Sequence, residues 1–517
     1  MKISNLFIIF GILLSVTITT SCTDWLTIKP ESETVLEDFW QSESQVNQML
    51  SACYKSMTEY SYLSRVLVWG ELRSDNVTFG NNIPDDIYKM LNVDISISNS
   101  YNAWGAIYTT INLCNTFLYY APDVVDIDQN FTKEELQTLE AEVLTIRALS
   151  YFYLVRTFQE VPWVDFPSID DTQDYSIPKS SEAFVLEKIV TDLNAALLYA
   201  RDRFDTPEYK KGRITKNAVR ALLADIYLWQ EDYDLCIQTC NQLIDNMGNV
   251  LLNGETVLQE VFVEGNSAES IFELQFDDEN NFNSVIRDFY GHNGNEKGFW
   301  SFPYVLVTGT ASPFNYLVAN NVESDDDLRL LDFLNPEPGG DRYFVFKYAG
   351  SERIQEENST YSDYNYREVT SNWIFYRLSD IILMEAEALI QLENFTDALA
   401  LINQTYLRSN PEVIDGGLKI ENYNSKNEME KLLLRERQRE LMFEGKRWFD
   451  LMRLARRADS PSPLLSYVMK KYSGTASVEA SKMSVMDALY LPIHSNELKA
   501  NSALEQNPFY KTYGENQ

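Results

Sequence analysis

The sequence predicts a mostly α-helical fold of tetratricopeptide-like helix pairs, interrupted by one loop-rich insert that carries short β-strands. Apolar side chains recur every three or four residues over 101–120 and 134–158, which is the spacing of one helix face. Two further stretches, 213–245 and 379–403, share the small-residue and apolar offsets of helix–turn–helix repeats. From about 248 to 371, short apolar alternations among Gly, Asn and Asp replace the helical period.

The first 21 residues are typical of an export signal. Lys2 precedes an uncharged run over 6–20, which is shorter than the roughly 20 apolar residues that a membrane span needs. Thr20 and Ser21 then precede Cys22, as in the lipobox of bacterial lipoproteins. We expect residues 1–21 to be a cleaved signal peptide, Cys22 to carry a lipid anchor, and 22–517 to form a single domain. An ordinary signal peptide followed by a chance cysteine is the alternative.

The composition limits the classes of ligand. The chain has 77 acidic and 43 basic residues and a formal net charge of −34. Such a surface repels phosphate backbones and anionic lipids, so we predict no binding to nucleic acid. Acidic polysaccharides are also poor partners, whereas neutral glycans and peptides remain open. The 45% of hydrophobic and 13% of aromatic residues provide enough material for a large core.

The two helix-pair stretches lie far apart in the sequence, so they do not form a tandem array. We expect them to stack in space within a helical scaffold over about 40–247 and 372–517, with the insert at about 248–371 between the two parts. Cys236 and Cys240 lie four residues apart on one helix face. We interpret them as small buried hydrophobic residues and not as a metal or redox pair.

The segment 428–457 has the pattern of an amphipathic helix, with a bend expected at Gly445. Acidic and basic residues alternate along it. This alternation predicts a salt-bridged face exposed to solvent, made of Arg435, Glu436, Arg437, Arg439, Glu440 and Glu444.

Several segments together resemble the SusD/RagB family of outer-membrane nutrient-binding lipoproteins. In chain order they are CTDWL at 22–26, RALSYFYLVRTF at 147–158, RLSDIILMEAEAL at 377–389, RERQRELMFEGKRWFDL at 435–451, LPIH at 491–494, NEL at 496–498 and QNP at 506–508. Two positions depart from the family pattern: His494 stands where a second proline is usual, and Phe509 follows Pro508 where glycine is usual. The motifs cover both ends of the chain but not 250–371.

The resemblance implies a SusD-like scaffold at the cell surface, anchored in the outer membrane by lipid. It also implies a SusC-like TonB-dependent transporter as partner, a nutrient glycan as ligand, and no catalysis. The same architecture binding peptides is the alternative for the ligand.

A sugar ring has an apolar face and hydroxyl edges, so its site needs exposed aromatic planes and a few polar groups. The densest aromatic stretch outside the helical motifs is 282–316. It supplies the candidate contacts Trp300, Tyr304, Phe299, Tyr290 and Asn293. A second candidate stretch supplies Trp69, Arg73, Asn76 and Tyr88. The alternative for each residue is that it packs the insert against the helices. Trp300 is the first contact we expect.

The sequence gives little support for a catalytic function. The chain has only two histidines, and it has no HExxH, GxGxxG or P-loop motif. We therefore predict no catalytic residues, no cofactor and no metal site, although the acidic loops 277–279 and 325–327 are candidates for a structural calcium ion. Two further functions stay open: a surface glycoside hydrolase, which needs only two carboxylates, and a helical-repeat adaptor that binds only proteins.

Overall fold

The structure is a computed structural model, and it describes most of the chain beyond residue 38. The described residues are 39–80, 83–169, 172–206, 211–248, 251–291, 300–301, 326–336, 343–354, 363–367, 370–414, 416–472 and 474–514. At 300–301, 336, 351–354, 363–366 and 512–514 only the backbone is described. The predicted signal peptide and Cys22 lie outside the described residues.

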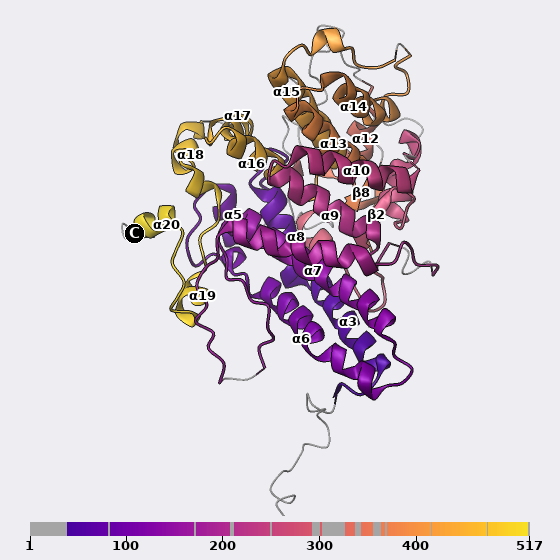
Figure 1. Ribbon diagram of the computed structural model, residues 1–517. Helices are drawn as coiled ribbons and strands as arrows, with labels where there is room; N and C mark the ends of the chain where they lie inside the picture. Colours follow the sequence, from indigo (N-terminus) through magenta and orange to yellow (C-terminus); the bar gives the residue numbers. More distant parts are fainter. Residues whose placement is uncertain are drawn as a thin grey trace, which may run out of the picture.

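Helices dominate the fold, as predicted, and those of the first half pack side by side in chain order (Figure 1). They are α3 (Glu43–Thr58), α6 (Gly105–Ile127), α7 (Lys133–Phe158), α8 (Glu182–Tyr199), α9 (Lys216–Trp229) and α10 (Tyr233–Met247). Thr132 and Glu135 form a capping box that begins α7, which satisfies backbone donors that would otherwise be unpaired. Every residue of α7 from Thr145 to Phe158 is buried, because neighbouring helices cover it.

The two predicted helix pairs stack on each other in space. The first pair is α9 and α10, and the second is α13 (Leu378–Gln391) and α14 (Phe395–Ser409). Helix α10 packs against α13, although 130 residues lie between Met247, the last residue of α10, and Leu378, the first of α13. Cys236 and Cys240 are buried free thiols on α10, as expected. The prediction of stacked pairs separated by a long insert is confirmed.

The end of the chain adds α15 (Lys426–Leu441), α16 (Arg447–Arg457) and several short helices. These are α17 (Ser462–Val468), α18 (Ala476–Lys482), α19 (Ser495–Ala500) and α20 (Pro508–Gly514). The expected single helix over 428–457 is two helices, because the chain turns at Met442–Lys446 with Gly445 at φ +70°.

Short elements of the first half are α4 (Tyr60–Leu67), the π-helix η2 (Val68–Leu72) and α5 (Asp85–Leu91).

The prediction of a solvent-exposed charged face on α15 is wrong. The six side chains assigned to that face are buried, with exposures of 8% or less. Segments from elsewhere in the chain supply their counter-ions, so that among the described residues five cations face five carboxylates in one cluster. This buried charge cluster comprises Arg329, Lys347, Arg377, Arg408, Arg439, Glu269, Asp327, Glu436, Glu440 and Glu444.

Three small antiparallel sheets lie within or beside the predicted insert. One has the order β1 (Val77–Thr78), β3 (Trp300–Ser301), β5 (Tyr343–Val345) and β4 (Leu334–Pro336). The second pairs β2 (Ser270–Leu274) with β8 (Trp373–Arg377), and the third pairs β6 (Gly350–Ile354) with β7 (Asp363–Tyr366). The insert also holds α11 (Ser284–Phe289) and α12 (Leu328–Phe333).

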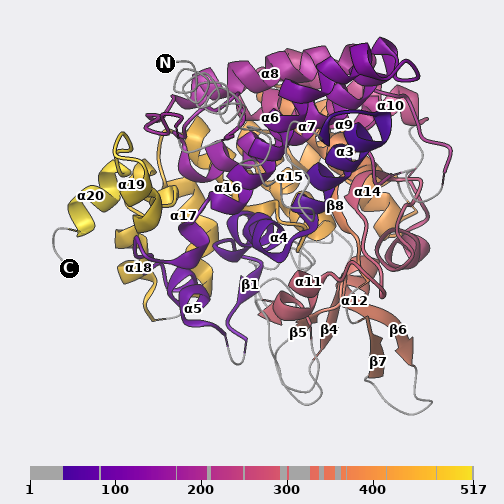
Figure 2. The ribbon, with the colours of Figure 1, turned by 90° about the horizontal axis from the view of Figure 1, so that it is seen from below.

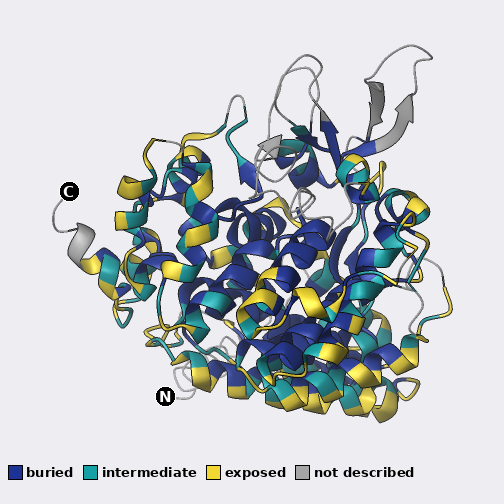
Figure 3. Ribbon diagram, turned by 90° about the horizontal axis from the view of Figure 1, so that it is seen from above, coloured by how far each residue is buried: buried dark blue, intermediate teal, exposed yellow. Residues whose placement is uncertain are grey.

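The sheets differ in where they lie relative to the core. Both β2 and β8 are entirely buried, and their apolar residues belong to the main core. Buried residues fill the middle of the molecule (Figure 3). By contrast, β1, β4, β5, β6 and β7 lie along one edge, together with α11 and α12 (Figure 2). The insert therefore contributes one sheet to the core and the others to an edge of the helical frame.

Candidate ligand-binding face

Strand pairing brings the two predicted ligand-binding stretches together. Thr78 in β1 pairs with Trp300 in β3, and Trp300 pairs in turn with Phe344 in β5. Thr78 belongs to the candidate stretch around Trp69–Tyr88, and Trp300 belongs to the stretch over 282–316. We call the sheet β1-β3-β5-β4, with its chain neighbours α5 and α11, the strand face.

The segment that leads into β1 is held by contacts with the turn between α15 and α16. Glu71 of η2 accepts hydrogen bonds from the Asn76 amide (2.6 Å) and from the backbone N–H groups of Phe443 (3.2 Å) and Gly445 (3.1 Å). Burial raises the pKa of Glu71 to about 7, against the lowering effect of these donors. Gly70 lies so close to Gly445 that a Cβ on Gly70 would stand 1.8 Å from its carbonyl oxygen. The path of the backbone into β1 is therefore tightly fixed.

Four of the predicted contact residues lie in the interior beneath this face. Trp69, Arg73, Asn76 and Tyr290 are at most 2% exposed. Their polar groups are used within the protein. Trp69 donates to the carbonyl of Tyr101 (2.9 Å), Arg73 to that of Leu489 (2.8 Å) and Tyr290 to that of Phe443 (3.0 Å), and Asn76 accepts from Gln438 (2.8 Å). These side chains position the face and do not present a surface to a ligand, because neighbouring elements cover them.

Tyr88 is the described candidate that faces solvent. Its side chain is 53% exposed on α5, and its ring lies 5.2 Å from that of Phe79, with 50° between the planes. Phe79 directly follows β1 and is half-buried. The pair offers an aromatic surface beside the first strand of the face, which is the kind of surface on which the apolar side of a sugar ring packs.

A second polar and aromatic group lies where α4 packs against α11, and sequence reasoning missed it. The hydroxyl of Tyr60 lies near Tyr101 and near Asp288 of α11, and both act on its pKa. Tyr60 is 42% exposed, and partial burial together with these neighbours raises its pKa, so the hydroxyl stays protonated. The available signal was Asp288 itself, which directly precedes the aromatic pair Phe289 and Tyr290 in the candidate stretch.

The remaining predicted contacts are not described. Phe299, Asn293 and Tyr304 lie outside the described residues, and at Trp300 the structure gives the backbone in β3 but not the side chain. In the part of the chain that the structure describes, no group of three metal-binding side chains occurs. The Asp277 carboxylate accepts three backbone N–H groups, and that of Asp327 is paired with Arg329 at 2.7 Å. Among the described residues, no helix combines the length and apolar character needed to cross a membrane.

The fold and the face define a class of protein: a frame of tetratricopeptide-like helices that carries a small sheet with exposed aromatic rings at one edge. The chain belongs to the SusD/RagB family. The SusD family model matches residues 342–510, and a model described as "Starch-binding associating with outer membrane" matches residues 24–228. Proteins of the SusD family bind without catalysis, so the prediction that the chain is not an enzyme is confirmed.

Relatives match over nearly the whole chain. SusD-like protein P38 of Formosa agariphila is 25% identical over 492 residues, which are 90% of this chain and 94% of that protein. SusD-like protein P2 of the same organism is 24% identical over 442 residues, 81% of this chain and 85% of that protein.

Solved structures show the same fold. A SusD superfamily protein from Bacteroides thetaiotaomicron superposes with a TM-score of 0.68 at 20% identity, over 91% of this chain and 99% of its own. A laminarin-binding SusD-like protein also has a TM-score of 0.68 at 20% identity, over 90% of this chain and 99% of its own. The predicted SusD-like scaffold is therefore confirmed.

Proposed function

We propose that this protein binds a neutral oligosaccharide at the strand face and passes it to a SusC-like TonB-dependent transporter in the outer membrane. The observation that carries the proposal is the pairing of β1 with β3, which joins the two stretches that the sequence marks as ligand-binding. The family description and the laminarin-binding structural relative support a glycan as ligand.

The chemistry of the described face fits a sugar. Tyr88 and Phe79 supply an exposed apolar ring surface, and Tyr60 and Asp288 supply a hydroxyl and a carboxylate that can bind sugar hydroxyls. Trp300, in the strand that pairs with β1, is the proposed stacking residue. Phe299, Asn293 and Tyr304, which are near it in the sequence, are the further proposed contacts.

Calorimetric titration with laminarin and with soluble starch tests the ligand class. We expect at least one of the two to bind, and Trp300→Ala and Tyr88→Ala to weaken binding about five- to thirtyfold each, because a lost ring contact costs about 1–2 kcal/mol. Tyr119→Ala is the matched control, since Tyr119 is 60% exposed on α6, away from the strand face. Full binding by both face variants, or binding of peptides but of neither glycan, contradicts the proposal.

The proposed location depends on the N-terminus. We propose that residues 1–21 are cleaved and that acyl chains on Cys22 hold the mature domain, 22–517, at the cell surface. More than one acyl chain is needed, because a single chain holds a protein to a bilayer only weakly. Radiolabelled palmitate should enter the wild type but not Cys22→Ala, and the variant should leave the membrane fraction. A labelled Cys22→Ala protein, or an unlabelled wild type, contradicts the anchor.

The proposed transporter partner is tested by purification. When the tagged protein is solubilised gently from outer membranes, a TonB-dependent transporter should copurify in a defined ratio. Trp300→Ala should retain that partner, because the variant changes ligand contact and not assembly. Recovery of the wild-type protein without a transporter contradicts the proposed delivery step.

A further inference from the structure

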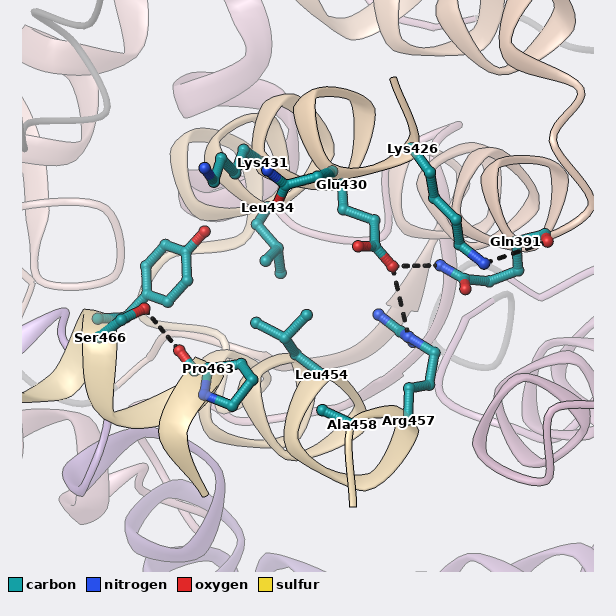
Figure 4. A pocket seen from close by; sticks show the side chains of 12 residues that line it. Gln391, Lys426, Glu430, Lys431, Leu434, Leu454, Arg457, Ala458, Pro463 and Ser466 are labelled. Carbon is teal, nitrogen blue, oxygen red and sulfur yellow. Dashed lines mark hydrogen bonds and ion pairs between the residues drawn. The ribbon is translucent and has the colours of Figure 1, made fainter. Parts of the chain in front are cut away.

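A groove of about 420 Å³ lies outside the strand face, between α15 and the pair α16 and α17 (Figure 4). Gln391, the last residue of α13, lies at one end of the groove, and Ser466 of α17 lies at the other. Its volume falls within the range of about 300–1,000 Å³ that is typical of small-molecule sites. No residue of the strand face lines it.

The groove has a positive lining, although the chain as a whole carries a net charge of −34. Lys426, Lys431 and Arg457 line it, and Glu430 is its one acidic lining residue. Glu430 is already engaged, because it accepts from the Gln391 amide at 2.7 Å and lies 3.7 Å from the Arg457 guanidinium. The Arg457 guanidinium also forms an ion pair with the buried carboxylate of Glu387, which lies 2.8 Å away.

Two ammonium groups are therefore left without a carboxylate partner among the described residues. The Lys426 ammonium donates only a long bond of 3.4 Å, to the carbonyl of Gln391, and Lys431 has no ion pair in the described part of the chain. The two lysines lie toward opposite ends of the groove, Lys426 beside Gln391 and Lys431 beyond Leu434 (Figure 4). A ligand that spans the groove can meet a positive charge at each end.

Between the two lysines the groove is apolar. The side chains of Leu434 and Leu454 point toward each other across it, and the Pro463 ring lies beside them (Figure 4). Tyr467 also lines the groove, and burial raises the pKa of its hydroxyl, which therefore stays a protonated hydrogen-bond donor. Flat apolar surface with polar groups at its margins matches a pyranose ring, whose two faces are apolar and whose edges carry hydroxyl groups.

We propose that this groove is a second saccharide site, selective for a short acidic sugar such as a disaccharide of uronic acids. One carboxylate pairs with Lys426 and the other with Lys431, while the rings lie over Leu434, Leu454 and Tyr467. The choice of a saccharide rests on the proposed function, whereas the selection of negative charge rests on the two lysines. The site gives a strongly acidic protein one place at which an acidic sugar is attracted instead of repelled.

The test compares two disaccharides that differ only at C6, where α-1,4-digalacturonate has carboxylates and α-1,4-galactobiose has neutral hydroxymethyl groups. Titration at low salt should show binding of digalacturonate and at least tenfold weaker binding of galactobiose. Lys426→Ala and Lys431→Ala should each weaken digalacturonate about three- to tenfold, and 0.5 M NaCl should weaken it further, because the groove is open to solvent. Lys431→Arg should retain binding, because it keeps the charge.

Controls separate this site from the strand face. Lys133→Ala removes an exposed charge on α7, outside the groove, and should leave digalacturonate affinity unchanged. Trp300→Ala should also leave it unchanged, while the lysine variants should bind laminarin or starch as the wild type does. Equal thermal midpoints confirm that the lysine variants are folded.

Three results overturn the proposal: no binding of digalacturonate by the wild type, equal binding of both disaccharides, or loss of digalacturonate binding in Trp300→Ala with none in the lysine variants. Failure of the proposed function is a different result. In that case laminarin and starch do not bind, and the digalacturonate titrations still report on the groove.

Discussion

Replacing Glu440 by glutamine should destabilise the folded protein by about 3 kcal/mol. Glu440 is fully buried on α15, where its carboxylate accepts hydrogen bonds from Arg377 (2.5 Å), Arg329 (3.0 Å) and Arg408. Burial acts to raise the pKa of Glu440, but the three guanidinium groups outweigh it and hold the pKa well below the ordinary value. A neutral amide of the same size leaves the buried charge cluster with one uncompensated positive charge.

The size of the expected destabilisation depends on the carboxylate partners that each guanidinium retains. Removing one partner of a buried ion pair costs about 3–5 kcal/mol. The lower end applies here because every arginine retains another carboxylate: Glu444 lies 2.7 Å from Arg377, Glu269 lies 3.0 Å from Arg408, and Asp327 lies 2.7 Å from Arg329. With an unfolding entropy of about 2.1 cal/mol/K per residue, 3 kcal/mol corresponds to a fall in Tm of roughly 3 °C for a chain of this length.

Scanning calorimetry of the wild type, Glu440→Gln and the control Glu505→Gln measures the effect. Glu505 is exposed and has no ion pair in the described part of the chain, so its variant should match the wild type within about 0.5 kcal/mol. Since folding lowers the pKa of Glu440, its contribution is complete above the unfolded pKa of about 4.3 and declines as the pH falls below it. The gap between wild type and Glu440→Gln should therefore narrow from pH 7 to pH 3. Equal midpoints for the two variants at pH 7 would refute the reasoning.

Three further predictions concern the stability of the fold. Gly70→Ala should greatly lower the yield of folded protein, because its Cβ would lie 1.8 Å from the carbonyl oxygen of Gly445. The control Gly105→Ala should fold normally, because the nearest atom to its Cβ would be 3.6 Å away. Nearby cations outweigh burial and lower the pKa of Asp380 to about 2, so stability should fall between about pH 4 and 2 in urea titrations, and less steeply in Asp380→Asn. Ser425→Ala removes half of the capping box of α15 and should cost about 1 kcal/mol, measured as a shift of the urea midpoint.

The helical frame could be predicted from the sequence because its signals are local. A helix of about four turns repeats its apolar face several times, as α10 does over Tyr233–Met247, where the buried side chains are Cys236, Cys240, Leu243 and Ile244. The period is therefore clear without knowledge of the partner. The spacing of small and apolar residues in 213–245 and in 379–403 can likewise be recognised within each helix pair by itself. Only their contact, α10 against α13, needed an argument about space, and repeat architecture supplied it.

The burial of the α15 charges could not be predicted in the same way. Alternating arginine and glutamate is the usual pattern of a solvated helix, and nothing within 426–441 indicates otherwise. The partners that make burial tolerable come from other segments. Glu440 pairs with Arg329 of α12, Arg377 at the end of β8 and Arg408 of α14, and Glu444 pairs with Lys347 after β5. A pattern within one helix carries no information about charges that lie 32 to 111 residues away in the sequence.

The strand face shows the same limit. Both candidate stretches could be found by their aromatic and polar residues, but their pairing depends on two-residue strands, which have no periodicity to recognise. Composition also could not separate Tyr88, which is exposed, from Trp69 and Tyr290, which are interior. Aromatic residues serve a core and a sugar site equally well, so the distinction lies in tertiary packing.

The buried charge cluster and the strand face are connected through the turn that follows α15. Ion pairs in a core are not required for stability, since apolar side chains of similar volume often serve as well or better. They do require their partners at fixed positions. Glu440 lies just before the turn that follows α15, and Glu444 lies within it. That turn binds Lys347 beside β5 through the carbonyl of Met442 (3.1 Å), Tyr290 beside α11 through that of Phe443 (3.0 Å), and Glu71 ahead of β1 through the Gly445 N–H (3.1 Å). The strands of the face thus take their relative positions from one backbone turn, which the charges of α15 hold in place.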